Sequence, residues 1–450
     1  MTTPLSRLAF RNLTPFQSLL LGFAAIILIG TLILLLPAAS KDGVPPSFID
    51  ALFTATSAVT TTGLVVVDTG GFYSLFGQVT ILCLFQIGGL GYMVFIVLFG
   101  HFIGSRISIG SRVTLQESIA GMSLGGIKKL IKTIFVITFM FELIGGFILS
   151  LNWTGQFPLP HAVYLGLFHS VSAFCTAGFG LFADSFMSEY NNPGVNIVLA
   201  IMSIAGAIGF FVMKDVYSYL RLAIRKDNSR RLTVHSKLAL TLSIMLMLFG
   251  SILILIFEKE SNLPAGDRIM TSIFQSISAS TTTGFNTVDI GALASTSLFI
   301  MIILMFIGAS PGGTGGGIKT TTFGAIILFI YALLRGKEEA HIFGRQISRE
   351  TIDKALAIGV IAVSLVTLDM AVLISTERAT FLNILFEVIS AIGTVGLSTG
   401  ITSSLTTVGK LVIIITMLIG RVGILAVGFS LFGRPEPDHF RWAEEELYIG

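Results

Sequence analysis

An eleven-residue pattern that occurs four times is the feature of this sequence that most restricts its fold. Each copy has Phe first, Ser-Ala at places five and six, Thr at place nine and Gly at place eleven. We call this pattern the frame, and its copies are Phe53–Gly63, Phe168–Gly178, Phe274–Gly284 and Phe386–Gly396. A period of about 110 residues is too long for a solenoid or propeller repeat, so each frame should belong to a unit of several elements.

The composition identifies the environment of these units. Hydrophobic residues make up 53% of the chain and charged residues 12%, which excludes an ordinary soluble protein. Long apolar runs lie near 16–37, 76–100, 130–151, 195–213, 237–257, 296–332, 355–375 and 408–432. The first run is longer than the core of a signal peptide, so it predicts a retained spanning helix.

One frame lies between the two members of each successive pair of apolar runs. The segments that lead into the frame glycines are too short to cross a bilayer, so they predict re-entrant pore helices. These predicted helices are Pro46–Val59, Ala162–Phe174, Asp267–Ser280 and Thr380–Ile392. The expected fold is therefore an all-α polytopic membrane protein with four pseudo-symmetric repeats of helix, pore helix, filter and helix. Eight spanning helices and four pore helices would surround one central pore.

The distribution of basic residues predicts the orientation. The predicted divisions are a segment 1–15, repeats at 16–100, 130–213, 237–332 and 355–432, and a tail 433–450. On one side of the membrane the connecting segments carry only Lys41, Lys259, Arg268, Arg378 and Lys410. Most other basic residues lie in segments on the opposite side, which predicts cytoplasmic amino and carboxyl termini in the cell membrane. All four frames then enter from outside, where acidic residues outnumber basic ones.

The frame ends predict an ion filter. Non-helical backbone at membrane depth must be buried in protein or line water, and rings of carbonyls can replace the hydration shell of a cation. Glycine at the last place permits positive φ, and threonine at place nine can support the ring with its hydroxyl. The predicted filter residues are Val59, Thr60, Thr61, Thr62, Gly63, Phe174, Cys175, Thr176, Ala177, Gly178, Ser280, Thr281, Thr282, Thr283, Gly284, Ile392, Gly393, Thr394, Val395 and Gly396. The alternative is a small-residue packing motif between membrane helices, which four copies at corresponding positions argue against.

The third inner run is interrupted over residues 308–320, and this interruption predicts a gate. Pro311 and five nearby glycines prevent a regular helix. The predicted gate residues are Gly308, Ala309, Ser310, Pro311, Gly312, Gly313, Thr314, Gly315, Gly316, Gly317 and Lys319, together with Arg421. Milder versions of this interruption lie at 88–91, 206–209 and 420–423. A simple packing kink is the alternative, and a phosphate-binding loop is disfavoured because Ile318 separates Gly317 from Lys319 between membrane helices.

Arg421 lies near the centre of the last apolar run. A charge there costs about 2.5–3.5 kcal/mol on insertion scales, so it needs partners or water. We expect Arg421 to donate hydrogen bonds to carbonyls of the 308–317 loop or to place a positive barrier in the pore. The alternative is an ion pair with Glu142 or Asp369 that only joins helices.

Other chemistries lack support in the sequence. The six histidines have no metal-ligand spacing, and no catalytic constellation indicates an enzyme. No basic and aromatic groove predicts nucleic-acid binding. No organic cofactor is expected, and Cys83 and Cys175 are expected to remain unpaired.

The four frames and their glycines resemble the Trk/Ktr/HKT superfamily of potassium transporters, and within it the bacterial KtrB-type subunits, from about residue 16 to the end. The resemblance implies potassium uptake across the plasma membrane, with Gly63 associated with potassium selectivity and sodium as a second candidate ion. It also implies an intramembrane gate at Gly308–Gly317 and a homodimer with one pore per chain. A cytoplasmic nucleotide-binding regulatory ring of the KtrA type is the implied partner, with Arg221–Lys237 and Gly433–Gly450 as candidate docking surfaces.

Two features leave alternatives. At place eight of the frame, the first and third repeats have threonine, whereas the second has Cys175 and the fourth has Gly393. The ring of carbonyls formed by the four frames should therefore be asymmetric. An alternating-access carrier of cations, including a sodium-coupled one, is the second functional hypothesis, although carriers often have inverted repeats and these repeats run in parallel. A structural membrane scaffold would have no reason to keep four broken segments.

Overall fold

The computed structural model of the chain describes residues 15–91, 127–225, 231–259, 263–337 and 339–427. The predicted N-terminal segment up to residue 14, the end of the first inner run (92–100), residues 428–432 and the tail 433–450 lie outside the described residues. Part of the candidate docking surface Arg221–Lys237, residues 226–230, lies outside them as well.

Four long helices form the first element of each repeat. They are α2 (Pro15–Leu34), α8 (Ile127–Trp153), α12 (Val234–Phe257) and α16 (Arg349–Thr376). Among the described residues, these four helices have the length and apolar composition needed to cross a membrane, and most of their side chains are not buried in the protein. An apolar helix with an exposed apolar surface is suited to lipid rather than water.

A short pore helix follows each outer helix, as the sequence predicts. The four are α3 (Phe48–Val59), α9 (Leu159–Phe174), α13 (Ala265–Thr281) and α17 (Phe381–Ile392). Their carboxyl ends agree with the prediction to within one residue. Polar caps begin two of them, because the Ser47 and Thr380 hydroxyls accept the N–H groups of Asp50 and Asn383. The first residue of every frame is buried within these helices, which keeps the frames inside the protein.

The four inner helices are shorter than predicted. They are α5 (Leu75–Leu90), α10 (Pro193–Ala207), α14 (Ser295–Ile307) and α18 (Thr407–Val422). Each ends within two residues of a glycine with positive φ, and these glycines are Gly91 (80°), Gly209 (93°), Gly308 (65°) and Gly423 (98°). Glycine adopts this backbone without a steric penalty, so it ends a helix readily.

The inner spans are therefore interrupted in the second, third and fourth repeats, whereas in the first repeat α5 ends at Leu90 and the residues after Gly91 lie outside the described ranges. Beyond Gly209 the chain continues as α11 (Phe210–Ile224), at an angle of 101° to α10, and beyond the α14–α15 loop it continues as α15 (Thr320–Leu334). The last glycine of each milder interruption, at 91, 209 or 423, has the positive φ and therefore corresponds to Gly308.

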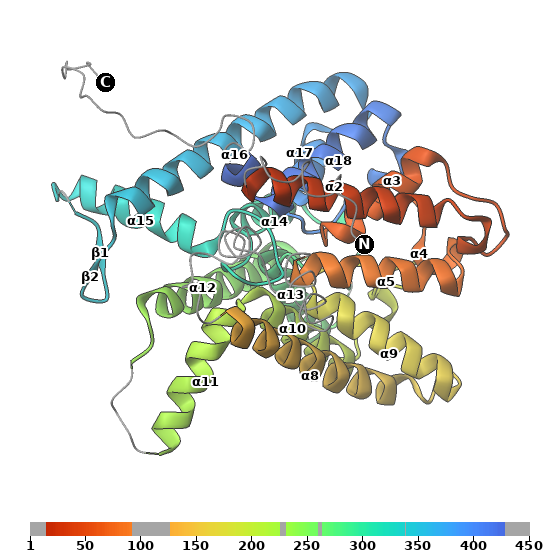
Figure 1. Ribbon diagram of the computed structural model, residues 1–450, viewed down its shortest axis with the longest axis horizontal. Coiled ribbons are helices and arrows are strands. Elements are labelled where there is room, and N and C mark those ends of the chain that lie inside the picture. Colours follow the sequence, from red (N-terminus) through yellow and green to blue (C-terminus); the bar gives the residue numbers. More distant parts are fainter. Residues whose placement is uncertain (1–14, 92–126, 226–230, 260–262, 338, 428–450) are drawn as a thin grey trace, which may run out of the picture.

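Short elements complete the fold. On one side of the membrane they are η1 (Pro37–Ala39), α4 (Thr69–Phe72), η3 (Met187–Glu189), η4 (Ile290–Ala292) and η5 (Thr402–Ser404). On the other side, β1 (His341–Ile342) pairs antiparallel with β2 (Arg345–Gln346), with His341 opposite Gln346. The all-α prediction missed this hairpin. Figure 1 shows the hairpin and α11 projecting at one end of the molecule, and α4 at the opposite end.

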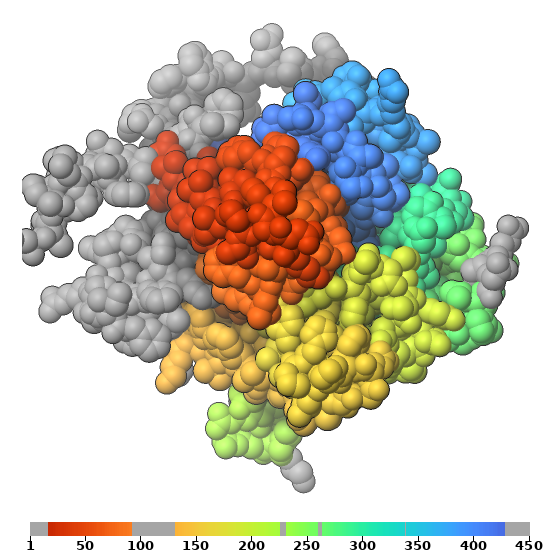
Figure 2. Space-filling view, turned by 90° about the vertical axis from the view of Figure 1, so that its right-hand side faces the viewer, coloured from red at the N-terminus to blue at the C-terminus, as the bar shows by residue number. Residues whose placement is uncertain are grey.

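The four repeats are arranged around a common centre. Figure 2 looks onto the end that carries α4 and shows the first (red to orange), second (yellow), third (green) and fourth (blue) repeats in turn. Polar contacts join neighbours: the Tyr164 hydroxyl donates to Gln78 at 2.8 Å between the second and first repeats. The Lys410 ammonium contacts the Asp50 carboxylate at 2.6 Å, which joins the last repeat to the first.

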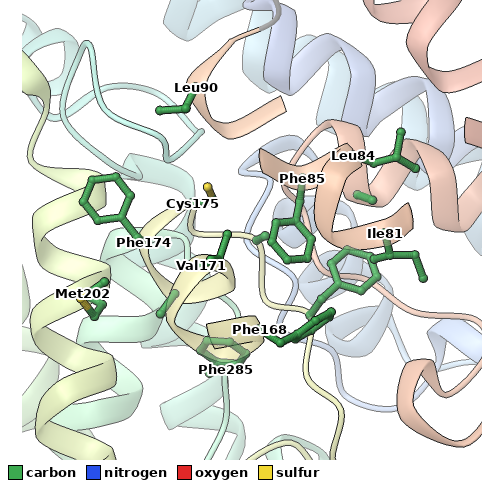
Figure 3. Close-up of a cluster of buried hydrophobic side chains, with 14 of the residues drawn as sticks. Ile81, Leu84, Phe85, Leu90, Phe168, Val171, Phe174, Cys175, Met202 and Phe285 are labelled. Carbon is green, nitrogen blue, oxygen red and sulfur yellow. The ribbon is translucent and has the colours of Figure 1, made fainter. Parts of the chain in front are cut away.

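Apolar side chains fill the space behind the frames. Figure 3 shows Phe85 of α5 beside Phe168 of α9, and the two rings meet edge to face with centroids 5.6 Å apart. Phe85 also stacks on Phe179, the residue after the second frame, at 6.0 Å. Such ring pairs add to the burial of apolar surface. The frame ends are therefore supported by packed aromatic side chains.

Candidate functional site

All four pore helices end in the same hydrogen-bonded turn. In the first, the Thr61 N–H donates to the Ala58 carbonyl (3.0 Å) and the Thr62 N–H donates to the Ser57 carbonyl (2.8 Å). This pair of bonds is the Schellman motif, which ends a helix at a left-handed residue. Equivalent pairs are made by Thr176 and Ala177, by Thr282 and Thr283, and by Thr394 and Val395. The Ser-Ala pair of the frame therefore supplies the two carbonyls that close the turn.

The left-handed residue of each turn is the frame threonine. The φ angles are 52° at Thr61, 50° at Thr176, 56° at Thr282 and 47° at Thr394. Glycine is usual at this place, and a β-branched residue there carries strain of about 1–3 kcal/mol. The sequence predicted that these threonines support the ring through their hydroxyls, and it did not predict their backbone. The same strained conformation in four separate segments indicates a functional constraint.

The last residues of the four frames form a closed ring. Gly63, Gly178, Gly284 and Gly396 have φ of 87°, 68°, 89° and 93°, as the sequence predicts. A Cβ atom on Gly63 would lie 2.6 Å from the Ala177 carbonyl oxygen and 2.9 Å from the Gly178 Cα atom. In the same way, Gly178 faces Thr283 and Gly284, Gly284 faces Val395 and Gly396, and Gly396 faces Thr62 and Gly63. We call these four residues the glycine ring.

Serine hydroxyls hold part of this ring from behind. The N–H of Gly63 donates to the Ser57 hydroxyl at 3.0 Å, and the N–H of Gly396 donates to the Ser390 hydroxyl at 3.1 Å. In the third repeat the Ser278 hydroxyl donates to the Phe285 carbonyl at 2.7 Å. The sequence analysis did not assign these serines a role, although serine at the fifth place of every frame was the available signal.

The residues that begin the predicted filter lie against the inner helices. The carbonyl oxygens of Val59, Phe174 and Ile392 lie where a Cβ atom on Gly88, Gly206 or Gly420, respectively, would overlap them. Ser280 is within α13, which continues to Thr281. Val59, Phe174 and Ile392 therefore end their pore helices, Ser280 precedes the end of α13 by one residue, and the glycine ring lies beyond all four in the chain.

The quarters of the site differ in their side chains. The Thr60 and Thr62 hydroxyls share a hydrogen bond of 2.7 Å, and Thr281 and Thr283 share one of 2.8 Å. Cys175 with Ala177, and Gly393 with Val395, cannot form this bond. The buried Cys175 thiol instead donates to Gln86 at 3.3 Å and lies 3.8 Å from the Glu142 carboxylate. Both cysteines are free thiols.

The α14–α15 loop, residues 308–319, contacts the ends of the pore helices. The Thr314 hydroxyl donates to the Phe174 carbonyl at 2.9 Å and lies 3.3 Å from the Thr176 hydroxyl. The Gly316 N–H donates to the Thr282 hydroxyl at 3.0 Å. A Cβ atom on Gly316 would overlap the Thr394 hydroxyl. The loop therefore lies against three of the four left-handed threonines.

Backbone hydrogen bonds define the shape of the loop. The Ala309 N–H donates to the Gly316 carbonyl at 3.1 Å, so the loop folds back on itself. The Ser310 N–H donates to the Ala207 carbonyl at 3.1 Å, and the Gly312 carbonyl accepts the Phe210 N–H at 3.0 Å. Lys319 donates to the Gly315 carbonyl at 2.6 Å. Pro311 lies within this turn, where its missing N–H is not needed.

Arg421 joins the loop to the first repeat. Its guanidinium donates to the carbonyls of Thr314, Gly88 and Gly89, the last at 3.0 Å. The hydrogen bond to a loop carbonyl is therefore present, as one of the sequence hypotheses predicted. Within the described ranges, no ion pair joins Arg421 to Glu142 or Asp369. Asp369 accepts a hydrogen bond from the Thr416 hydroxyl at 2.7 Å instead.

The fold and the site together define a class of protein. Four repeats with lipid-facing outer helices surround a closed ring of backbone, and an irregular loop lies against that ring. Irregular backbone at this depth occurs where it is buried or lines a pathway, so the class is that of membrane transport proteins.

Comparisons with known proteins give the family. The TrkH model of cation transport proteins matches residues 6–432. The chain is 41% identical over 442 residues to the Ktr system potassium uptake protein B of Bacillus subtilis, with 97% of each chain covered. It is 37% identical to the potassium/sodium uptake protein NtpJ of Enterococcus hirae, with 98% of each covered. The structure of the potassium transporter TrkH from Vibrio parahaemolyticus aligns with a TM-score of 0.73 at 19% identity, over 94% of this chain and 86% of that chain.

This chain therefore belongs to the Trk/Ktr family of potassium uptake transporters, and the resemblance noted from the frames is confirmed. The fold class is confirmed by the helical structure and its structural relative. The relatives named above are ion transporters rather than enzymes.

The contact between the loop and the fourth repeat gives a prediction of stability. Gly316→Ala should lower the free energy of unfolding by about 1–3 kcal/mol, because its Cβ would overlap the Thr394 hydroxyl and lie 2.6 Å from the Gly393 carbonyl oxygen. Thermal denaturation of the purified protein in detergent measures this effect.

The matched control is Gly266→Ala in α13. Its Cβ would meet no atom within 4 Å, and alanine is the better helix former by about 1 kcal/mol, so this variant should be unchanged or slightly more stable. Equal denaturation midpoints for the two variants would contradict the packing of the loop against Thr394.

Proposed function

We propose that this chain takes up potassium through the glycine ring, which acts as the selectivity filter. The observation that carries the proposal is the closed ring itself: four segments with the same left-handed threonine and glycine meet one another in turn. Backbone carbonyls in such a ring supply neutral oxygen ligands in place of the hydration shell of a monovalent cation. The pore helices also direct their electronegative carboxyl ends toward the ring, which favours a cation there.

The proposed filter consists of the segments 60–63, 175–178, 281–284 and 393–396, with Val59, Phe174, Ser280 and Ile392 as supports at the helix ends. Potassium as the principal ion is supported by the names of the relatives and by the glycine at position 63, which the resemblance associates with potassium. Sodium is included as a second transported or coupled ion because one relative is named a potassium/sodium uptake protein.

We infer that the α14–α15 loop is the gate of this pathway. Its contacts support the inference, since the loop hydrogen-bonds to the turns that precede the glycine ring in the second and third repeats. Each bond between neutral groups contributes only about 0.5–1.5 kcal/mol, so a modest regulatory energy suffices to displace the loop. Arg421 would hold the closed position through Thr314 and act as the partner of the gate.

The assembly is part of the same proposal. We propose a homodimer with one pore per chain in the plasma membrane, cytoplasmic termini, and control by a cytoplasmic nucleotide-binding ring of the KtrA type. The basic segment Arg221–Lys237 and the tail Gly433–Gly450 are the proposed docking surfaces for this ring. The mass of the purified protein in detergent, without the regulatory ring, is expected to equal that of two chains. A mass equal to that of one chain would contradict the dimer.

The filter proposal predicts the effect of changing one ring glycine. Gly63→Ser should reduce the discrimination between potassium and sodium by about tenfold or more, because its side chain would overlap the Ala177 carbonyl oxygen at a left-handed position. Uptake of each ion into uptake-deficient cells, with the other ion as competitor, measures the discrimination.

Gly43→Ser is the matched control for this experiment. Gly43 also has a positive φ of 71°, but no atom lies within 4 Å of its Cβ position. The control should therefore share the backbone strain and keep the discrimination of the wild type. Unchanged discrimination in Gly63→Ser would reject the filter, and transport of a neutral solute would favour another class of transporter.

The gate proposal predicts that weakening the loop raises uptake without the regulatory ring. Deletion of residues 313–316 should give the largest basal potassium flux, and Thr314→Val a smaller increase of a few fold, because valine removes the hydroxyl that donates to Phe174. Flux into vesicles that contain only this chain is the measurement. Thr367→Val, which removes a hydroxyl bonded within its own exposed helix turn, is the control, and wild-type flux in the deletion variant would reject the gate.

A further inference from the structure

The second residue of every frame is polar and buried, and neither the glycine ring nor the loop accounts for it. These residues are Thr54, His169, Gln275 and Glu387, and all four are almost completely inaccessible to solvent. A buried polar group within a membrane protein is costly unless it has a hydrogen-bond partner. The partners of these four side chains therefore indicate what the side chains are for.

In the middle repeats the partner lies three residues after the ring glycine. The Nε2 atom of His169 accepts the backbone N–H of Leu181 at 3.0 Å. Its Nδ1 atom lies 2.8 Å from the Leu165 carbonyl oxygen, which fixes the neutral tautomer with the proton on Nδ1. The amide of Gln275 donates to the Thr287 hydroxyl at 3.1 Å. Each bond connects the pore helix to the segment that leaves the glycine ring.

The fourth repeat makes the strongest version of this contact. One carboxylate oxygen of Glu387 accepts the Ser398 hydroxyl at 2.8 Å, and the other accepts the Thr402 hydroxyl. The Ser398 hydroxyl in turn accepts the N–H of Gly400 at 3.0 Å. Ser398 lies two residues after Gly396, so a carboxylate in the pore helix organises the whole outgoing turn.

The first repeat uses a longer connection. The Tyr73 hydroxyl donates to the Thr54 hydroxyl at 3.3 Å, and Tyr73 lies just before α5 rather than directly after Gly63. The chemistry differs in every repeat, but each side chain connects its pore helix to the segment between the ring glycine and the inner helix.

We propose that the second residue of each frame is a positioning residue for the glycine ring, with Glu387 the most important of the four. The Schellman turn fixes each ring segment on the side of the pore helix, and the second frame residue fixes the same segment after the glycine. A segment held at both ends keeps its carbonyls at a constant distance from the axis, and potassium and sodium differ in the distance they require. This inference rests on the proposed role of the glycine ring as a filter.

The test compares Glu387→Leu with Glu387→Gln in the potassium and sodium competition assay. Leucine removes both acceptors, so the discrimination should fall about tenfold, as expected when two buried hydrogen bonds are lost. Glutamine keeps an oxygen for Thr402 and offers an N–H to Ser398, so it should stay within about twofold of the wild type.

Glu377→Leu is the matched control. The Glu377 carboxylate accepts the Thr406 N–H at 3.0 Å on the same side of the membrane, but it belongs to no frame. This variant should keep the discrimination of the wild type. If Glu387→Leu is not recovered as folded protein, Thr402→Val removes one partner and leaves the carboxylate, and it should lower the discrimination by a few fold.

Two outcomes would overturn the inference. Wild-type discrimination in transporting Glu387→Leu or Thr402→Val protein would show that the contact does not position the ring. An equal loss in Glu387→Gln and Glu387→Leu would show that the charge, and not the hydrogen bonding, matters. The Gly63→Ser measurement separates the two proposals, since an effect of Gly63→Ser without an effect at Glu387 rejects the positioning role alone.

Discussion

The lack of hydrogen-bond partners in lipid is the constraint on which this structure depends. Each non-helical peptide group at membrane depth must therefore be buried in the protein or line a pathway. The four frame ends meet this requirement together. Each closes a Schellman turn on its own pore helix, and its glycine then contacts the backbone of the next repeat. The four segments therefore fill the centre of the molecule only as a set, which explains why one chain contains four copies of one pattern.

Small residues make this convergence sterically possible. The carbonyls that end three pore helices contact inner-helix glycines, and each ring glycine contacts the next repeat, so side chains would separate these backbones. Other glycines end the inner helices, since a glycine with positive φ lies within two residues of the end of each one. The close approach at the ring and the ends of the inner helices therefore both depend on glycine. The loop after α14 lies beside the ends of the pore helices and contacts Thr176, Thr282 and Thr394.

Much of the fold could be predicted from the sequence because strong local signals determine it. The pore helices end within the frames, where the helical pattern of the sequence stops. The positive φ of Gly63 was predictable because glycine has no side chain to oppose it. The end of α5 before Gly91 was understated, since three glycines in an apolar run do not reveal at which residue the helix stops. The left-handed backbone of Thr61 was missed because threonine normally avoids it, and only contacts distant in sequence hold it there. The sequence suggested that Arg421 contacts the loop that contains Thr314, but it could not decide between this contact and an ion pair with Asp369. Only the structure, which brings these distant residues together, identifies the contact with Thr314.

The glycine ring is built from one chain, so a mutation changes only one of its four quarters. In a channel of four identical subunits, one codon change alters all four quarters at once. Here a change at Cys175 or Gly393 alters a single quarter and leaves three intact. Each quarter can change separately during evolution. Thr60 and Thr281 each form a hydroxyl pair with a neighbouring threonine, whereas Cys175 and Gly393 have no hydroxyl and form no such pair. Because the four segments belong to one chain, each quarter of the proposed filter can change separately and in small steps.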